Sequence, residues 1–311
     1  MIKNILTITL NPTIDKSSAV SKITPERKLR CEQPKYEPGG GGINVSRGLS
    51  RLNVPSTAFF PAGGRTGSLL EELLRSDSIT TMPLKVHGET RENFIVVETS
   101  TNQQYRFGMP GAEISGLEQE SIFKSIMGID PFPDLIVFSG SLPPGVEPSF
   151  LRRIIKEAKK KSCKVIADTS GSALNEAVEE GVFLLKPNIG ELAKLAGVES
   201  LDNESADDAA KELVKKGKTE VVVVSMGPLG AYLVTKDMNE HIMAPAVKKL
   251  STVGAGDSMV AGMVAMLAKG GSYSEMAKMG VACGTAATMN PGTGLFKKDD
   301  AEKLFKWLNR N

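Results

Sequence analysis

The stretch Ser251-Thr252-Val253-Gly254-Ala255-Gly256-Asp257-Ser258 stands directly before an apolar run with helical spacing, residues 259–267. This spacing predicts a helix that begins near Asp257. A helix N-terminus presents unpaired N–H groups and about half a positive charge, so it suits an anionic group, and glycines let the backbone approach that group closely. Asp257 has two interpretations that the stretch leaves open. It caps the helix, or it is the base that takes a proton from a hydroxyl attacking a phosphoryl group.

Composition and charge narrow the class of protein. The chain has 311 residues, of which 41% are hydrophobic and 24% charged, as in an ordinary globular protein. Folds of the α/β class often build one core at this length. The net charge of +2 is close to neutral, so we expect neither a nucleic acid nor a membrane as a partner. No apolar run approaches the roughly 20 residues that span a bilayer, and the N-terminus lacks a signal-peptide layout.

The cysteines and histidines argue against several kinds of site. Cys31, Cys163 and Cys283 are far apart and form no CxxC pair, so we expect neither a zinc site nor a disulfide framework. This pattern indicates a reducing, cytoplasmic location. His87 and His241 stand in polar sequence, where surface positions are expected, and a Ser-His-Asp hydrolase is therefore disfavoured.

Strands alternate with helices along most of the chain. Short apolar runs, each followed by a polar or glycine-rich loop, predict strands at residues 5–10, 57–61, 134–138, 164–168, 183–185 and 221–224. The helices between them imply a mostly parallel sheet covered by helices on both faces. Ligands bind at the carboxyl edge of such a sheet, so Asp15, just past the first strand, is a candidate ligand group as well as a turn residue.

Four consecutive glycines, residues 39–42, stand near the front of the chain. Each glycine costs conformational entropy on folding, so packing does not explain the run. A flexible linker is one interpretation. The other is a ligand-binding loop at the start of a helix, with Arg47 and Arg51 away from the apolar side of that helix. Asn44 could then hydrogen-bond a polyol.

Two segments with a weak two-residue period, about 16–37 and 86–109, interrupt the main pattern and predict a small β-sheet lid. The second segment reads as a hairpin with its turn at Thr101-Asn102. It carries Arg91 and Arg106. Exposed arginines on strands are usually solvated, but two of them on one small sheet could clamp a phosphate group of a substrate.

Taken together, these motifs resemble the PfkB-type carbohydrate kinases, which have the three-layer ribokinase-like α/β fold. The resemblance covers essentially the whole chain as a single kinase domain, residues 1–311, and the pair of glycine motifs near its two ends is highly specific. Further matches favour the subgroup of minor bacterial 6-phosphofructokinases, namely Lys28-Leu29-Arg30-Cys31, Phe60-Pro61-Ala62-Gly63-Gly64, Tyr105-Arg106-Phe107, residues 139–145 and Lys186-Pro187-Asn188.

The resemblance implies that ATP with Mg²⁺ phosphorylates fructose 6-phosphate at its 1-hydroxyl, and that K⁺ is a further candidate cofactor. Asp257 would accept the hydroxyl proton, and the anion hole would comprise Gly254, Ala255 and Gly256. General chemistry agrees with this assignment. Phosphoryl transfer needs in-line positioning and charge neutralisation more than covalent help. A carboxylate with a reference pKa of about 4 is ionised at neutral pH and can accept the proton.

The resemblance also implies binding roles by position. The sugar would contact Asp15, Gly39, Gly40, Asn44 and Asp257, and its 6-phosphate end, or the lid above it, would contact Lys28, Arg91, Arg106 and Ser141. ATP would contact Lys186, Asn188, Ser225, Gly227, Gly230, Thr252, Gly254 and Gly256, with Mg²⁺ near Glu191. The monovalent-cation loops would comprise Ser251, Val253, Ala287, Asn290 and Gly292.

Gly41 bears on the choice of substrate. Family members that act on fructose 1-phosphate often carry lysine at this place in the glycine run, so Gly41 argues against a 1-phosphofructokinase. A tagatose-6-phosphate kinase stays open, because its substrate differs from fructose 6-phosphate only at one carbon. The intact Asp257 disfavours a non-catalytic sugar- or nucleotide-binding regulator. The lack of a Gly-x-Gly-x-x-Gly motif after the first strand disfavours a dehydrogenase.

The predicted lid also bears on assembly. A small sheet of this kind has exposed edges, and proteins usually cover such edges. Pairing two lids would cover them. We therefore expect a homodimer through the lid, with a phosphosugar and ATP as the small-molecule partners.

Overall fold

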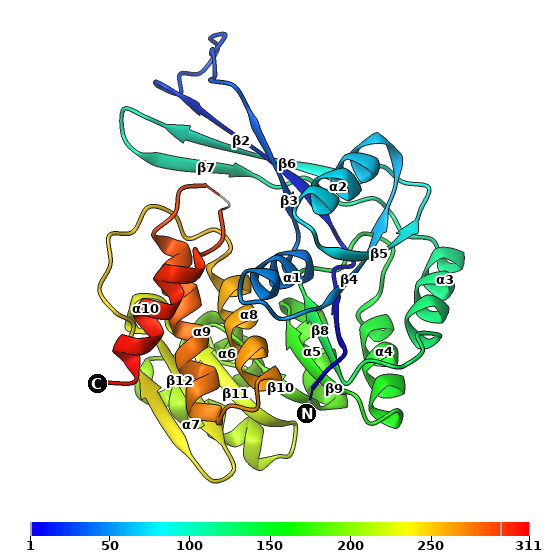
Figure 1. Ribbon diagram of the computed structural model, residues 1–311, viewed down its shortest axis with the longest axis vertical. Coiled ribbons are helices and arrows are strands. Elements are labelled where there is room, and N and C mark those ends of the chain that lie inside the picture. Colours follow the sequence, from blue (N-terminus) through cyan, green and yellow to red (C-terminus); the bar gives the residue numbers. More distant parts are fainter. Residues whose placement is uncertain (1, 293, 311) are drawn as a thin grey trace.

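The structure is a computed structural model that describes residues 2–292 and 294–310 (Figure 1). Nine strands of this described part form the main sheet, in the order β13-β12-β11-β10-β9-β8-β1-β4-β5. Neighbours from β11 to β5 are parallel, whereas β12 and β13 are antiparallel. The bounds are β1 Ile5–Ile8, β4 Thr57–Ala62, β5 Thr80–Lys85, β8 Leu135–Ser139, β9 Lys164–Asp168, β10 Val182–Leu185, β11 Thr219–Ser225, β12 Ala231–Thr235 and β13 Asn239–Ile242.

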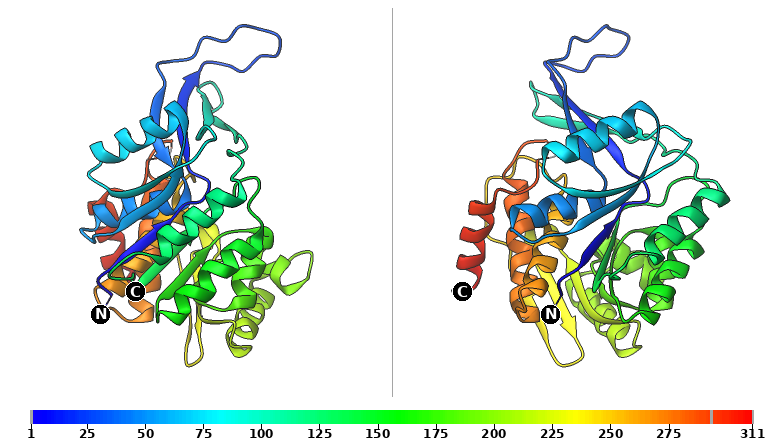
Figure 2. Two further views of the ribbon diagram at one scale, coloured as in Figure 1. Left: turned by 90° about the vertical axis from the view of Figure 1, so that its right-hand side faces the viewer. Right: turned by 45° about the vertical axis from the view of Figure 1, so that its right-hand side comes forward.

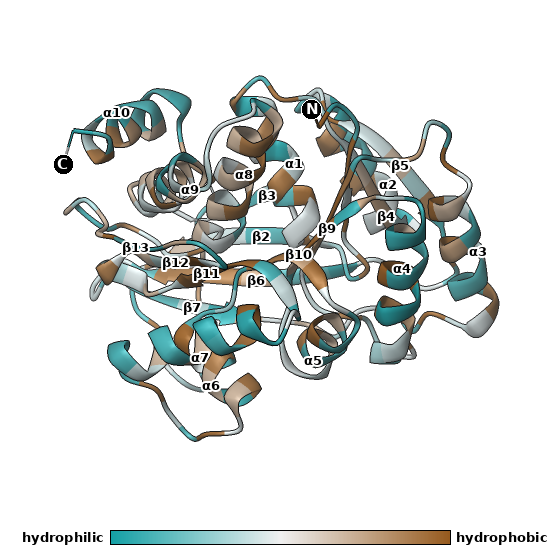
Figure 3. Cartoon of the chain, turned by 90° about the horizontal axis from the view of Figure 1, so that it is seen from below, coloured by the Kyte–Doolittle hydropathy of each residue, from teal (hydrophilic) through white to brown (hydrophobic). Residues whose placement is uncertain are grey.

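Helices cover both faces of this sheet, as Figure 3 shows from below. On one face lie α1 Gly41–Arg51, α2 Gly64–Ser76, α8 Ala255–Ala268, α9 Tyr273–Thr288 and α10 Lys298–Leu308. On the other lie α3 Gly116–Met127, α4 Pro148–Lys160, α5 Gly171–Glu180, α6 Ile189–Ala196 and α7 Asn203–Lys215. The central strands β8, β10 and β11 contain unbroken apolar runs because helices bury both of their faces. The predicted three-layer, mostly parallel fold is confirmed.

A second, four-stranded sheet stands beyond the carboxyl edge of the main one (Figures 1 and 2). Its order is β3-β2-β6-β7, from the strands β2 Thr13–Val20, β3 Lys35–Gly39, β6 Arg91–Glu98 and β7 Gln103–Phe107. The strands β6 and β7 form the predicted antiparallel hairpin. The loop between β2 and β3 projects past the end of this sheet, at the top of Figure 1.

Two helix starts show how the glycine motifs are used. The run at residues 39–42 is not a flexible linker, because α1 begins at Gly41 and the run leads straight into it. Nearly all of α1 is buried, including Arg47, which the sequence pattern had placed away from the apolar side. The helix predicted near Asp257 begins two residues earlier, at Ala255.

No helix of residues 2–292 and 294–310 is both long and apolar enough to cross a membrane. Cys31, Cys163 and Cys283 are all free thiols.

Candidate active site

The amide of Asn44 meets the carboxylate of Asp257 at the carboxyl edge of the main sheet. Asn44 lies in the first turn of α1, and its Nδ2 donates a hydrogen bond to Asp257 Oδ2 at 2.8 Å. The two helices pack against each other on the same face of the sheet. The two glycine motifs of the sequence, which are 213 residues apart, therefore present their polar side chains to one site.

Asp257 does not cap its helix. The N-cap position of α8 belongs to Gly254, whose φ of 72° is a left-handed conformation that favours glycine, and no side chain caps the helix. Asp257 is instead the third helical residue, and its carboxylate points to Asn44. The first N–H groups of an α-helix lack partners within it. In the described part of the chain the Ala255 N–H donates to the Thr252 carbonyl at 3.4 Å, so the N–H groups of Gly256 and Asp257 are the ones available to an anion next to Asp257.

The surroundings of Asp257 raise the pKa of its carboxyl group toward physiological pH. Its pKa is raised to about 6, first because neighbouring protein atoms exclude water from the carboxylate, and second because the Asp168 carboxylate lies nearby. The Asn44 hydrogen bond and the Lys186 ammonium act in the opposite direction, and Asp15 adds a smaller rise. A carboxylate with such a pKa is ionised at pH 7 but still basic enough to accept a proton.

Lys186 and Asp168 form a buried ion pair beside Asp257. Lys186 follows β10, Asp168 ends β9, and Lys186 Nζ lies 3.0 Å from Asp168 Oδ1. Burial lowers the pKa of Lys186, but Asp168 and then Glu191 and Asp257 outweigh it, so the pKa is raised. The ammonium is therefore charged at neutral pH. Sequence reasoning missed Asp168, although it is a polar residue at the end of a central strand, the signal that singled out Asp15.

Asp15 approaches the site from the second sheet. It lies on β2, and its Oδ1 accepts a hydrogen bond from Asn93 Nδ2 on β6 at 3.0 Å. Gly39 on β3 pairs with Thr13, two residues before Asp15, and a Cβ on Gly39 would lie only 2.6 Å from Asp15 Oδ2. Burial raises the pKa of Asp15, and the Asn93 hydrogen bond partly opposes this rise. Gly40, next to Gly39, is the N-cap residue of α1.

Asn188 and Glu191 form a capping box at the start of α6. Asn188 Oδ1 accepts from the Glu191 N–H at 2.8 Å, and Glu191 Oε2 accepts from the Asn188 N–H at 2.9 Å. This box fixes both side chains at the end of β10, near Lys186. Glu191 also acts electrostatically on Lys186.

The turn predicted to line a nucleotide lies at the adjacent strand end. Ser225 ends β11 and donates its N–H to the Pro187 carbonyl at 2.9 Å, so the ends of β10 and β11 are joined. Gly227 begins a single 3₁₀ turn, residues Gly227–Leu229, and Gly230 follows it directly before β12 begins. Both glycines have positive φ.

The predicted monovalent-cation loops are also brought together. Ser251 Oγ donates to the Gly292 carbonyl at 2.8 Å, and the Val253 N–H donates to Ser251 Oγ at 3.2 Å. Ala287 and Asn290 lie at the C-terminal end of α9, where both are buried. The five residues thus contribute neutral carbonyl, hydroxyl and amide groups at the base of the α8 loop.

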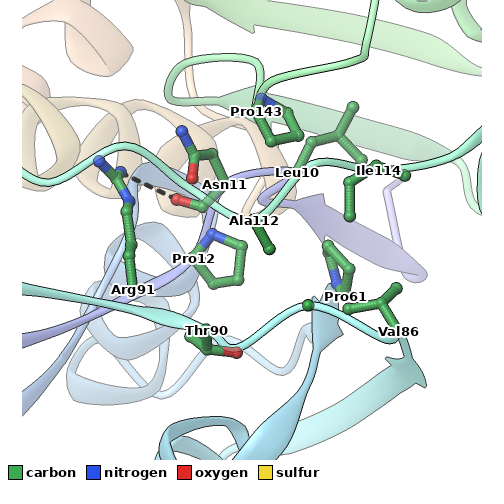
Figure 4. A pocket seen from close by; sticks show the side chains of 11 residues that line it. Leu10, Asn11, Pro12, Pro61, Val86, Thr90, Arg91, Ala112, Ile114 and Pro143 are labelled. Carbon is green, nitrogen blue, oxygen red and sulfur yellow. Dashed lines mark hydrogen bonds between the residues drawn. The ribbon is translucent and has the colours of Figure 1, made fainter.

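Arg91 contacts the backbone rather than open solvent. Its Nη2 donates to the Asn11 carbonyl and its Nη1 to the Met109 carbonyl, both at 3.0 Å, and Figure 4 shows the first contact beside a small apolar cavity of about 10 Å³. Asn11 in turn donates to Ser141 Oγ at 3.1 Å. Arg91 and Ser141 are therefore connected through Asn11, at the base of the second sheet.

Arg106 connects the second sheet to the glycine-rich loop that precedes α8. From β7 its Nη2 donates to Thr252 Oγ1 at 3.3 Å and to Gln104 Oε1 at 3.1 Å. Lys28, in contrast, is exposed on the projecting loop between β2 and β3 (Figure 1). Of the predicted sugar-side cations, the structure brings Arg106 next to the α8 loop and leaves Lys28 on the projecting loop.

A comparison with models of protein families shows the family to which the chain belongs. Residues 5–300 match the model described as pfkB family carbohydrate kinase. The chain belongs to the pfkB family of carbohydrate kinases. The family resemblance of its motifs is confirmed.

Curated relatives span nearly the whole chain. The ATP-dependent 6-phosphofructokinase isozyme 2 of Escherichia coli (strain K12) is 42% identical over 98% of this chain and 99% of its own length. The enzyme of the same name from Mycobacterium tuberculosis is 40% identical over 97% of this chain and 89% of its own length. Two other relatives are less similar. The 1-phosphofructokinase of Bacillus subtilis is 34% identical over 93% of this chain and 94% of its own length. A tagatose-6-phosphate kinase of Staphylococcus epidermidis is 30% identical over 98% of this chain and 98% of its own length.

Solved structures agree with this placement. Phosphofructokinase-2 of E. coli in complex with potassium has a TM-score of 0.96 at 42% identity, and its complex with fructose 6-phosphate has 0.94 at 40%, each over 100% of both chains. A tetrameric inhibited form of that enzyme has a TM-score of 0.93 at 41% identity, again over 100% of both chains. An Arabidopsis thaliana ribokinase, at 19% identity, 98% and 99% coverage and a TM-score of 0.76, shows that the fold is ribokinase-like.

Proposed function

We propose that this chain transfers the γ-phosphoryl group of ATP to the 1-hydroxyl of fructose 6-phosphate, giving fructose 1,6-bisphosphate and ADP. The observation that carries the proposal is Asp257 itself, with a pKa of about 6, in the first turn of α8 and hydrogen-bonded to Asn44. The identity of 40–42% with enzymes named 6-phosphofructokinase isozyme 2 supports the choice of substrate.

Asp257 acts as the general base in this proposal. As the 1-hydroxyl oxygen bonds to phosphorus, its proton passes to the Asp257 carboxylate, and the bond between the γ-phosphorus and the bridging oxygen of ATP breaks toward ADP. The N–H groups at the start of α8, around Gly254, Ala255 and Gly256, face the charge on the transferred group. Such a base typically contributes about 100- to 10,000-fold in rate.

Lys186, Asn188, Glu191 and Asp168 form the polar wall on the nucleotide side. The charged Lys186 offers a cation to the phosphates of ATP, and Thr252, Ser225, Gly227 and Gly230 would line the rest of the nucleotide. The described residues contain no group of three or more His, Cys, Asp or Glu that could hold a metal alone. This donor set fits Mg²⁺, which is usually bound by one or two carboxylates together with substrate phosphates, and Glu191 would be one of them. When bound, Mg²⁺ supplies charge neutralisation on the phosphates.

The loops of Ser251, Val253, Ala287, Asn290 and Gly292 are the proposed site of a monovalent cation. Their neutral oxygens suit K⁺ better than a transition metal. The potassium complex of the related E. coli enzyme supports this assignment. A cation there would stabilise the loop from which α8 begins.

The proposed contacts with the sugar are Asp15, Gly39, Gly40 and Asn44. The proposed contacts with its 6-phosphate, or with the lid above it, are Arg91, Arg106, Ser141 and Lys28. The lid is the second sheet, formed by the segments about 16–37 and 86–109. Gly41 supports fructose 6-phosphate over fructose 1-phosphate. A Cβ there would lie 2.7 Å from the Ser139 carbonyl carbon and 2.8 Å from the Gly140 nitrogen, so the lysine of many 1-phosphofructokinases would not fit this backbone.

A coupled ADP-release assay tests the proposal directly. The purified chain with ATP and Mg²⁺ should turn over fructose 6-phosphate with a higher kcat/KM than fructose 1-phosphate, tagatose 6-phosphate, fructose or ribose. A higher kcat/KM for tagatose 6-phosphate or fructose 1-phosphate would show that the chain is a kinase with a different substrate from the one proposed. No ADP release with any of the five sugars would contradict the proposal and favour a binding regulator.

We further infer a homodimer through the second sheet. Its edge strands β3 and β7 have open backbone edges, and Tyr36 and Phe107, which lie on them, are exposed by 37% and 48%. The tetrameric inhibited form of the E. coli relative supports self-association of this family member. Light scattering should give a dimer at micromolar concentration and a smaller species for Phe107→Glu, whereas a wild-type monomer would contradict the inference. The free thiols support a cytoplasmic location.

A further inference from the structure

Arg47 is a charged residue in the middle of α1 whose side chain is buried, with only 6% of the residue exposed. A buried guanidinium is costly unless its N–H groups are hydrogen-bonded. Its Nε donates to Asp77 Oδ2 at the end of α2 (2.9 Å), and its Nη1 donates to the Pro38 carbonyl (3.1 Å) and to Asn44 Oδ1 (3.5 Å). Only the Asp77 contact is an ion pair. The other two lead into the proposed sugar site.

The contact with Arg47 favours one orientation of the Asn44 amide. A carboxamide has one acceptor oxygen and one donor nitrogen group, whereas a guanidinium can only donate. Because Arg47 donates to Asn44 Oδ1, the Asn44 Nδ2 group faces Asp257, to which it donates at 2.8 Å. In the flipped orientation the amide oxygen would face the carboxylate of Asp257, and the amide nitrogen would face the guanidinium of Arg47, so neither contact would pair a donor with an acceptor. Arg47 therefore favours the orientation that stabilises ionised Asp257.

The contact with Pro38 fixes the backbone on the other side of the site. Pro38 lies on β3 directly before Gly39, and Gly39 packs against the Asp15 carboxylate. The Arg47 charge also acts on Asp15, lowering its pKa as one of several smaller contributions. One guanidinium thus connects the glycine run, Asn44 and Asp15.

We propose that Arg47 is a positioning residue for phosphoryl transfer: it fixes the Asn44 amide and the Pro38 carbonyl, and through Asn44 it orients the base Asp257. This inference rests on the proposed function and deepens it. The competing account makes Arg47 a structural residue whose ion pair with Asp77 merely joins α1 to α2. Packing alone does not require the charge, because well-packed apolar residues often replace buried ion pairs without loss of stability.

The two accounts differ in what they predict for the ionisation of Asp257. The charged groups that face it are Asp168, Lys186 and Asp15, and the Asn44 hydrogen bond stabilises its ionised form. Loss of the Asn44 orientation removes a donor from the carboxylate, so the pKa of Asp257 rises further. A purely structural role for Arg47 leaves that pKa unchanged.

The experiment compares Arg47→Met and Arg47→Lys with the control Asp77→Asn. Methionine has similar length and no donors. Lysine keeps the charge but has one nitrogen in place of the planar guanidinium, whose Nε donates to Asp77 while its Nη1 donates to Pro38 and Asn44. Asp77→Asn removes the ion pair and leaves both site contacts in place. The pKa of Asp257 is read from the carboxyl carbon resonance that disappears in Asp257→Asn, which needs no turnover, and kcat and KM are measured in parallel with fructose 6-phosphate and ATP.

For Arg47→Met we expect a higher pKa of Asp257, an acid limb of kcat shifted to higher pH, and kcat about 10- to 100-fold lower at pH 7. Arg47→Lys should show the same changes in smaller measure, and it replaces Arg47→Met if that variant fails to fold. Asp77→Asn should melt at a lower temperature with an unchanged Asp257 pKa. A folded Arg47 variant with wild-type pKa and kcat overturns the inference, as does Asp77→Asn shifting the pKa equally. If wild type itself lacks turnover, the resonance still decides the role of Arg47 while the proposed function fails.

Discussion

Asn44 Nδ2 lies 2.8 Å from Asp257 Oδ2, although the two residues are separated by 213 positions in the chain. The contact joins the first turn of α1 to the first turn of α8. Each helix start follows a glycine-rich loop, so two backbone segments that can approach a ligand closely meet around one carboxylate. This arrangement accounts for the presence of both glycine motifs in one chain.

The raised pKa of Asp257 makes a prediction about activity at low pH. Only the ionised carboxylate can accept a proton, so kcat/KM should fall about tenfold for each pH unit below about 6. It should be flat from about pH 7 upward until another group titrates. The measurement is a pH–rate profile with the coupling enzymes checked separately at each pH. A profile that stays flat down to pH 4.5 would rule out Asp257 as the titrating base.

The same pKa predicts that Asp257 costs stability. Its folded pKa of about 6 lies above the reference value of 3.8, so folding becomes less favourable as pH rises through that window, and the full cost is present above it. We therefore expect Asp257→Asn to melt at the same temperature as wild type or higher at pH 7.5. At pH 4 the difference should shrink, because the carboxyl is protonated in the folded state. An Asp257→Asn variant that melts below wild type at pH 7.5 but at the same temperature as wild type at pH 4 would contradict the prediction.

Asp168→Asn should move the activity profile in the opposite direction to Arg47→Met. The Asp168 carboxylate raises the pKa of both Asp257 and Lys186. Without it, the acid limb of kcat/KM should shift to lower pH. Lys186 loses its ion-pair partner, so the variant should also melt at a lower temperature. An acid limb that shifts upward would show that the electrostatic account of Asp257 is wrong.

The contact between Arg106 and Thr252 separates a sugar-binding role from a structural one. Thr252→Val removes a single exposed, uncharged acceptor, so kcat and KM should change by less than about tenfold. Arg106→Ala removes a cation that could meet the sugar phosphate, so KM for fructose 6-phosphate should rise about 10- to 100-fold. Arg106→Lys should recover part of this loss. Equal effects of Thr252→Val and Arg106→Ala would indicate that the arginine serves only to hold the loop.

The fold could be read from the sequence because its signals are local. Apolar runs such as 134–138 and 221–224 became central strands, and the hairpin around Thr101-Asn102 formed as predicted. The helix predicted near Asp257 begins at Ala255, and its cap is Gly254, which has the backbone conformation for that position, rather than Asp257, which has the chemistry of a cap. Side-chain type did not reveal which residue occupied the cap position.

The site was only partly predictable. Asp257 and Asn44 were predicted from the glycine motifs and Lys186 from the family resemblance, but Asp168 was missed because no glycine-rich motif marks it. Arg47 was placed outside the buried face, since a charge on a helix is usually solvated. Its burial depends on Asp77 and Pro38, which approach from other elements, and such contacts between distant segments have no local signature.

The turnover of Asp257→Asn tests the central claim most directly. The variant keeps the shape of the side chain and removes the base, so kcat with fructose 6-phosphate and ATP should fall about 100- to 10,000-fold while KM for both substrates changes by only a few-fold. The matched control is Asp208→Asn, an aspartate with a 77% exposed side chain on α7, which should retain wild-type kcat. If Asp257→Asn is folded and keeps kcat within tenfold of wild type, Asp257 is not the base and the account fails.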